Sequence, residues 1–88
     1  MAIEVRIPTI LRTYTGGEKA VDGSGATLVE LIDDLESRHP GIKDRLCDGD
    51  ELRRGIAVFV NSDVAQRGLA QGVPENAEVH FVPAIGGG

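Results

Sequence analysis

Cysteine and aromatic side chains are scarce in this chain of 88 residues. Cys47 is its one cysteine, it has no tryptophan, and its aromatic residues are Tyr14, Phe59 and Phe81. A single cysteine excludes an internal disulfide, a four-cysteine zinc site and a cysteine-held iron–sulfur cluster, and it fits a reducing cytoplasm. With so few rings available, we expect an aliphatic core.

Basic runs and long apolar runs are also missing. The net charge is -5 with no cluster of lysine or arginine along the sequence, so a phosphate backbone would be repelled. An acidic chain suits a basic groove on a protein partner instead. No apolar run approaches the roughly 20 residues of a membrane span, and the start, MAIEVR, lacks the pattern of a signal peptide. We therefore expect a cytoplasmic protein with no nucleic-acid and no membrane partner.

The first part of the chain has the pattern of a hairpin. Apolar and charged residues alternate over 3–7, which predicts a half-buried strand that Pro8 ends. A longer connection follows over 9–15. Gly16-Gly17 is typical of a hairpin turn and leads into a short second strand over 18–22.

One amphipathic helix follows. Thr27 and Glu30 have the spacing of a capping box. Apolar residues then recur at helical spacing: they are Leu28, Leu31, Ile32 and Leu35. Pro40-Gly41 predicts that the helix ends near His39. Residues 42–46 suit one more turn, and 47–55 are polar and are predicted to be a loop.

The last third of the chain is predicted to be mainly strands. Residues 56–60 are apolar and rich in β-branched side chains, and Asn61-Ser62 predicts a turn after them. Residues 64–69 suit a brief edge strand, and 78–83 suit the last strand. A hairpin, a helix and further strands predict an α+β fold with one helix on a mixed sheet of four to five strands. The β-grasp (ubiquitin-like) architecture is the natural candidate, with a single domain over 1–85 and a flexible glycine tail over 86–88.

Most residue types that carry chemistry have a structural explanation. His39 and His80 are the only histidines, and we expect both to be partly exposed surface residues. Cys47 lies beside Asp48 and Asp50, whose charge would raise its thiol pKa, so an incidental cysteine is favoured over a nucleophile. The carboxylates of the helix are interpreted as a solvated face rather than a metal site.

Two glycine-rich segments are candidate functional motifs. Gly23-Ser24-Gly25 precedes the helix but lacks the third glycine of a dinucleotide fingerprint and any Gly-Lys-Ser/Thr, so it is interpreted as a turn. The end of the chain, Gly86-Gly87-Gly88, is either a frayed tail or cloning remnant, or a working group. Glycine has no Cβ, so such a tail can enter a narrow channel and leave its terminal carbonyl open to attack.

A wider resemblance decides between these interpretations. Residues 76–88, NAEVHFVPAIGGG, resemble the C-terminal signature of the MoaD/ThiS family of sulfur carriers. In that signature a turn, an apolar strand, a proline and small residues lead to a final Gly-Gly. Residues 58–61, VFVN, resemble the family's third strand and asparagine turn, and 28–40 resemble its helix and following proline. The resemblance covers nearly the whole chain, and its most specific part is the terminal Gly-Gly.

The connection after the first predicted strand narrows the resemblance to one subgroup of the family. IPTILR at 7–12, followed by TGG at 15–17, is similar to the actinobacterial CysO-type carriers of cysteine biosynthesis. Two features depart from the family pattern. The usual Gly-Asp-Glu turn is replaced by PENAE at 74–78, and Gly86 takes a place that is variable in the family. Neither departure affects Gly87 or Gly88.

The resemblance implies a protein co-substrate rather than an enzyme. Gly86 and Gly87 would thread into an E1-like adenylyltransferase, which uses ATP and Mg²⁺ to adenylate the carboxylate of Gly88. A sulfur donor would then convert that group to a thiocarboxylate. In the cysteine branch, a PLP-dependent cysteine synthase supplies the activated serine that takes up the sulfur, and a metalloprotease releases the cysteine formed on Gly88. The carrier itself would bind no cofactor and no metal.

Two other functions remain open. A molybdopterin synthase small subunit, or another biosynthetic sulfur carrier, would differ only in the enzyme that receives the sulfur. A ubiquitin-like protein modifier would instead be linked through Gly88 to lysines of other proteins. A plain β-grasp binding module would not need a bare Gly-Gly end.

The alternation of the last strands predicts a partner-binding patch. His80 and Val82 share the face opposite Phe81, and we assign Phe81 to the face that the helix covers. By the same alternation, Phe59 in the preceding strand lies on the outer face. We therefore predict a patch of Phe59, His80 and Val82, whose positions relative to the terminus also resemble the binding patch of ubiquitin. The alternative is that Phe59 is a core residue.

Overall fold

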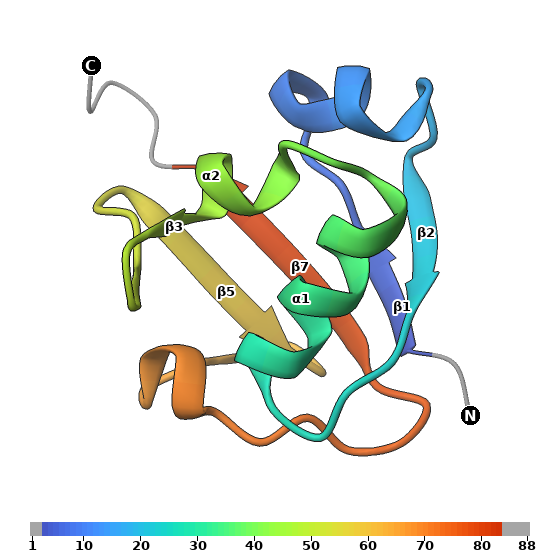
Figure 1. The fold of residues 1–88 in the computed structure, drawn as a ribbon. Helices are drawn as coiled ribbons and strands as arrows, with labels where there is room; N and C mark the ends of the chain where they lie inside the picture. The colour runs from blue at the N-terminus through green and yellow to red at the C-terminus, as the bar shows by residue number, and fades with distance from the viewer. Residues whose placement is uncertain (1–2, 84–88) are drawn as a thin grey trace.

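The computed structural model describes residues 3–83 and shows one five-stranded sheet crossed on one face by a helix (Figure 1). The strands are β1 (Ile3–Arg6), β2 (Ala20–Gly23), β5 (Ile56–Val60), β6 (Asp63–Val64) and β7 (Glu78–Pro83). Their order in the sheet is β2-β1-β7-β5-β6. β1 and β7 are parallel, while the other pairs are antiparallel. This is the predicted α+β arrangement with a mixed sheet, a β-grasp fold.

The helix α1 (Leu28–Arg38) begins and ends where the sequence predicts. The Thr27 hydroxyl oxygen accepts a hydrogen bond from the Glu30 backbone N–H at 3.4 Å. The Glu30 carboxylate in turn accepts from the Ala26 N–H at 2.9 Å, one residue earlier than in the usual capping box. After the helix, Gly41 has φ +99°, and a Cβ there would lie 2.9 Å from the Tyr14 ring. Glycine is therefore required on both counts.

The helix α2 (Ile42–Leu46) matches the extra turn predicted there, but three connections differ from the predictions. Residues 9–15 form a 3₁₀ helix, η1 (Thr9–Thr15). The predicted loop after α2 contains a two-stranded hairpin, β3 (Cys47–Asp48) with β4 (Glu51–Leu52). The brief edge strand is the shorter β6, and η2 (Gly68–Ala70) follows it. These elements have two to seven residues, too few to show a hydrophobic period, and distant packing decides their form.

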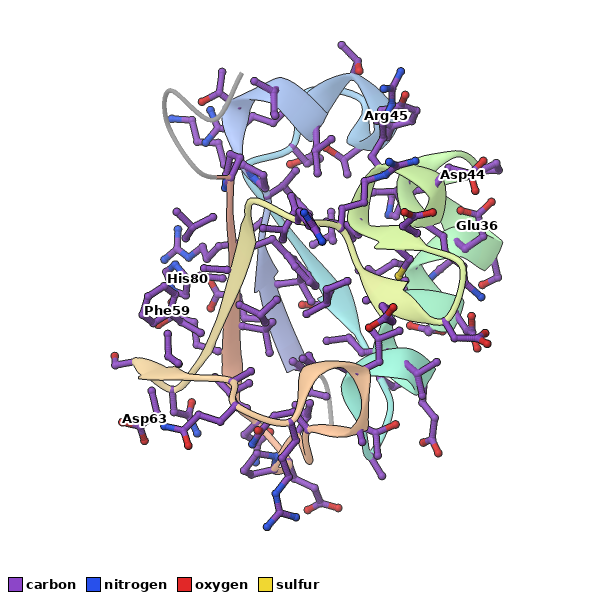
Figure 2. The ribbon with its side chains drawn as sticks, turned by 90° about the vertical axis from the view of Figure 1, so that its left-hand side faces the viewer. Glu36, Asp44, Arg45, Phe59, Asp63 and His80 are labelled. Carbon is purple, nitrogen blue, oxygen red and sulfur yellow. The ribbon has the colours of Figure 1, made fainter. Side chains whose placement is uncertain are left out.

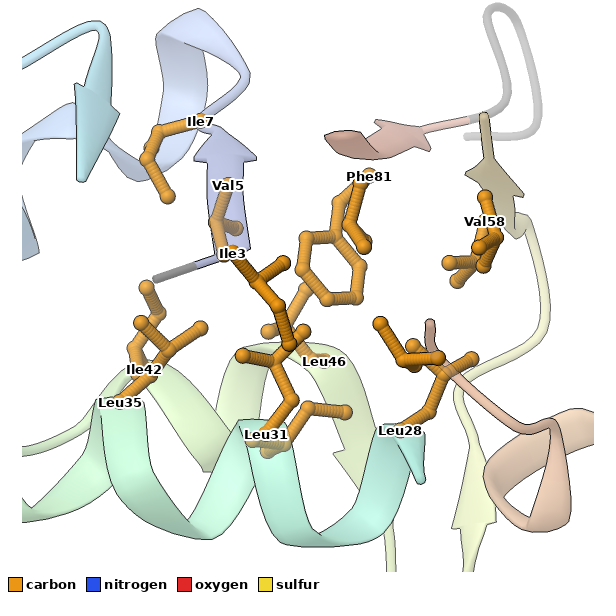
Figure 3. Packing of buried hydrophobic residues seen from close by; sticks show 14 of the residues in the cluster. Ile3, Val5, Ile7, Leu28, Leu31, Leu35, Ile42, Leu46, Val58 and Phe81 are labelled. Atoms are coloured by element: carbon orange, nitrogen blue, oxygen red, sulfur yellow. The ribbon is translucent and has the colours of Figure 1, made fainter. Parts of the chain in front are cut away.

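The core is aliphatic, as predicted, and lies between the sheet and the helices (Figure 3). Leu28, Leu31, Ile32 and Leu35 of α1 have no exposed surface. They meet Val5 and Val79 from the two central strands, both also fully buried. Phe81 is the one aromatic ring within this cluster, with 3% of its surface exposed. Burying a side chain of this kind contributes roughly 1.5–3 kcal/mol, so the helix stripe holds α1 on the sheet.

Candidate functional site

The strand that leads to the glycine tail is held on both sides. Gly86, Gly87 and Gly88 lie outside the described residues, as does the predicted boundary after residue 85. β7, the last described strand, is paired with β1 on one side and β5 on the other, and its Pro83 lies opposite Ile56. The last described residue therefore lies on the central strand of the sheet, at a position set by two neighbouring strands.

The asparagine turn after β5 anchors the start of β7. Asn61 has φ +51°, in the left-handed region that asparagine tolerates. Its backbone N–H donates to the Glu78 carbonyl at 2.8 Å, and its side-chain oxygen accepts from the Glu78 N–H at 2.9 Å. These two bonds fix the register between β5 and β7, and with it which residues of β7 face the core.

The three residues predicted to form a patch lie together on the outer face of the sheet. Phe59 and His80 are directly opposite each other on β5 and β7, on the side away from α1 and α2 (Figure 2). Phe59 is half-buried rather than part of the core, so the alternative that placed it in the core is wrong. Val82 follows on the same face with 42% of its surface exposed.

The sheet register adds two residues that the sequence analysis missed. Ala57 lies opposite Val82, and Val64 of β6 lies opposite Phe59, with 48% of its surface exposed. The sequence predicts an edge strand over 64–69 that includes Val64, but the partner of Val64 depends on the turn at 61–62, which brings β6 back onto β5. We call Ala57, Phe59, Val64, His80 and Val82 the outer patch.

Charged side chains border the outer patch on the β1 side. Arg6 lies 3.0 Å from Glu4 and 3.2 Å from Glu78, measured from its Nε to a carboxylate oxygen in each case. The His80 ring nitrogen lies 3.4 Å from the other oxygen of Glu78. The hydrogen bond from His80, followed by that from Arg6, lowers the pKa of Glu78. A row of polar and charged side chains thus lies beside the apolar residues, as in the polar rim of many protein interfaces.

Cys47 is buried at the end of α2, with 6% of its surface exposed. Its thiol pKa is raised, as predicted, but the main cause is different. Burial is the largest contribution, and the acidic residues that add to it are Asp33 and Asp44 rather than Asp48 and Asp50. A buried thiol with a raised pKa is a poor nucleophile and packs as a small apolar side chain.

Cys47 is therefore expected to resist alkylation in the folded protein. Iodoacetamide at pH 7.5–8 (about one unit or less below an ordinary thiol pKa) should modify it at least about tenfold more slowly than the same thiol in urea, because thiolate fraction and access both fall on burial. Intact mass against time measures both rates. Equal rates in the folded and the urea-unfolded protein would contradict this assignment.

The carboxylates on α1 have structural partners. Asp34 pairs with Arg38, and Asp33 pairs with Lys43. The Glu36 carboxylate accepts hydrogen bonds from the backbone N–H groups of Gly41 and Lys43, which lower its pKa and join α1 to α2. Within residues 3–83 no group of three or more histidine, cysteine or acidic side chains is arranged to hold a metal ion.

Comparisons with known proteins identify the family of this chain. The model of the ThiS family matches residues 5–88. The chain belongs to the ThiS family. The sulfur carrier protein CysO of Mycobacterium tuberculosis (strain H37Rv) is 41% identical over 93 aligned positions that cover 100% of both chains.

Solved structures of family members are similar throughout. A chain in the crystal structure of the Amycolatopsis orientalis BexX/CysO complex is 49% identical, with a TM-score of 0.93 over 99% of this chain and 100% of that one. Crystalline Mycobacterium tuberculosis CysO is 39% identical, with a TM-score of 0.87 over 94% and 99% of the two chains. As a ThiS-family member the protein is a carrier rather than an enzyme. No helix of the described residues has both the length and the apolar character to cross a membrane.

Proposed function

We propose that this ThiS-family protein carries sulfur as a thiocarboxylate on Gly88. The observation that supports this most directly is the likeness to CysO of Mycobacterium tuberculosis, a named sulfur carrier, which covers both chains from end to end. A carboxylate is unreactive, so an E1-like enzyme, with Mg²⁺, would first join it to the AMP part of ATP and release pyrophosphate. Sulfide sulfur then replaces AMP at the carbonyl carbon. Glycines at 86–88 leave that carbonyl free of neighbouring side chains.

We further propose that the sulfur is used for cysteine biosynthesis. The likeness to CysO and the segment at 7–17 both favour this branch over a molybdopterin synthase subunit or a protein modifier. A PLP-dependent synthase would supply the activated serine, and a metalloprotease would release the cysteine. Loaded carrier mixed with that synthase and activated serine should become heavier than the unloaded protein by the mass of one cysteine residue, because the thiocarboxylate sulfur displaces the leaving group on the serine Cβ and the acyl group then shifts from sulfur to the amine. Transfer to lysines of other proteins instead would favour the modifier.

Intact mass spectrometry tests the carrier function. After incubation with the activating enzyme, ATP, Mg²⁺ and sulfide, the protein should become about 16 Da heavier as sulfur replaces one oxygen of the terminal group. Without ATP the mass should not change. Cys47→Ala is the control for thiol chemistry, because alanine adds no polar group to the core, and it should load at the normal rate. Failure of the native protein to gain sulfur, or failure of a well-folded Cys47→Ala variant, would refute the assignment to Gly88.

The outer patch is proposed as the surface to which the activating enzyme binds. Exposed valines and a half-buried ring on one sheet face, beside the strand that leads to the tail, are suited to a protein interface. Val82→Asp should weaken binding to the enzyme about tenfold or more, since it places a charge among apolar contacts. Isothermal titration calorimetry measures this.

Val29 provides a matched control for the patch. It is an exposed valine, 37% accessible, but it lies on α1 on the other side of the sheet. Val29→Asp should bind within about twofold of the native protein, a difference below the cost of a lost contact. Normal binding by a well-folded Phe59→Ala, Val82→Asp double variant would rule out the outer patch as the binding surface for the activating enzyme.

A further inference from the structure

A basic pocket adjoins the outer patch in this acidic protein. The pocket has a volume of about 310 Å³ and lies where β1, η1, the start of β2 and β7 meet. Three of the residues that line it are apolar, Ile7, Pro8 and Phe81, and the other four are basic: Arg6, Arg12, Lys19 and His80. No acidic residue lines it. The chain as a whole has 14 acidic residues and 9 lysines and arginines, so the fold has gathered positive charge at one place.

Two of these basic side chains, Arg12 and Lys19, have no acidic partner within residues 3–83. Arg6 is compensated by Glu4 and Glu78. Arg12, by contrast, donates from its Nε to the Ile7 carbonyl at 3.1 Å. Neither Arg12 nor Lys19 forms an ion pair with a described residue. The bond to Ile7 orients the Arg12 guanidinium and leaves its two terminal nitrogens as donors. The pocket thus presents a guanidinium and an ammonium group to one ligand.

The pocket is continuous with both the outer patch and the tail strand. His80 belongs to the pocket and to the patch, where it faces Phe59. Because β1 and β7 are parallel, the ends of both strands lie at the same edge of the sheet. The chain turns into η1 after β1 at that edge, and β7 continues there to Pro83 (Figure 1). A partner that covers the outer patch and receives the tail would therefore also cover the pocket.

We propose that the basic pocket binds a carboxylate-bearing segment of the enzyme that activates the tail, an inference that rests on the proposed function. A guanidinium fork beside an ammonium group matches the two oxygens of an Asp or Glu side chain. The net charge of the whole chain favours a basic partner surface. The positive charge of the pocket instead favours an acidic partner segment at this end of the sheet. The acidic segment fixes the orientation of the carrier, and the outer patch supplies apolar contact.

Charge reversal at the pocket tests this proposal. Lys19→Glu and Arg12→Glu should each weaken binding to the activating enzyme about tenfold at low salt, because a like charge then faces the acidic segment. The affinity of both variants should also depend less on salt than that of the native carrier. Calorimetry without ATP, at low and high sodium chloride, measures binding independently of sulfur loading.

Arg67→Glu is the matched control. Arg67 precedes η2, which lies at the opposite end of the sheet from η1 (Figure 1), and its reversal changes the net charge equally. It should bind within about twofold of the native carrier. Thermal melts check that Arg12→Glu folds. If Arg12→Glu does not fold, Lys19→Glu still tests the proposal, because the Lys19 side chain makes no hydrogen bond to another described residue.

The outcomes separate the pocket from the proposed function. If both pocket variants bind like Arg67→Glu, the proposal is overturned. It is also overturned if they bind the enzyme normally while inorganic phosphate shifts the amide NMR signals of the pocket, which would indicate a small-anion site. Lys19→Glu should still gain sulfur when the enzyme is saturating. A native carrier that binds through the pocket but never gains sulfur would contradict the proposed function and leave the docking contact standing.

Discussion

Adding one alanine after Gly88 is expected to abolish sulfur loading completely. The proposed reaction joins AMP to the carboxylate of Gly88, and the added residue converts that carboxylate to an amide. The new terminal carboxylate would stand beside a Cβ and one residue farther along the chain. Intact mass after incubation with the activating enzyme, ATP and sulfide measures the loss. Sulfur gain by the capped protein would contradict the assignment.

Deleting Gly88 tests whether the length of the tail matters in addition to its terminal carboxylate. The shortened chain still ends in two glycines, Gly86 and Gly87. Its carbonyl would nevertheless fall about 3.5 Å short, the length of one extended residue. Because adenylation needs the carboxylate within bonding distance of ATP, we expect no sulfur gain from this variant either. Normal loading would mean that the position of the last residue does not matter, which contradicts threading to a fixed depth.

Phe81→Ala is expected to have the largest effect on stability. Phe81 is the one ring in the core cluster and lies over α1 with 3% of its surface exposed (Figure 3). Replacing a buried phenylalanine by alanine costs roughly 3–5 kcal/mol through lost burial and the cavity left behind. Domains of this size have about 5–15 kcal/mol in total. Urea denaturation followed by far-ultraviolet circular dichroism should show a much lower midpoint.

Phe59→Ala is the matched control for Phe81→Ala. Both phenylalanines lie in paired strands, but Phe59 is half-buried on the outer face. Its removal leaves no closed cavity, so we expect a loss of at most about 2 kcal/mol. Equal losses in the two variants would mean that the two faces of the sheet are packed alike, contrary to the burial described here.

Local patterns in the sequence determined the elements that carry the proposed function. Alternation over 78–83 defines β7 and its two faces, and the same rule places Phe59 on the outer side. Thr27 and Pro40 bound α1, because capping and the restriction before proline act within a few residues. The terminal glycines are visible in the sequence as they stand. These features depend on neighbours in the chain, so they can be predicted without a structure.

Only the tertiary structure decided which distant residues meet. η1 and the β3–β4 hairpin are too short to have a period of their own, and packing against α2 sets their form. Val64 joins the outer patch through the register of β6 on β5. Arg12, Lys19 and His80 come from three separate segments, and the parallel pairing of β1 with β7 brings these segments to one edge. The sequence alone therefore predicts an acidic carrier, whereas its basic pocket depends on contacts between residues far apart in the chain.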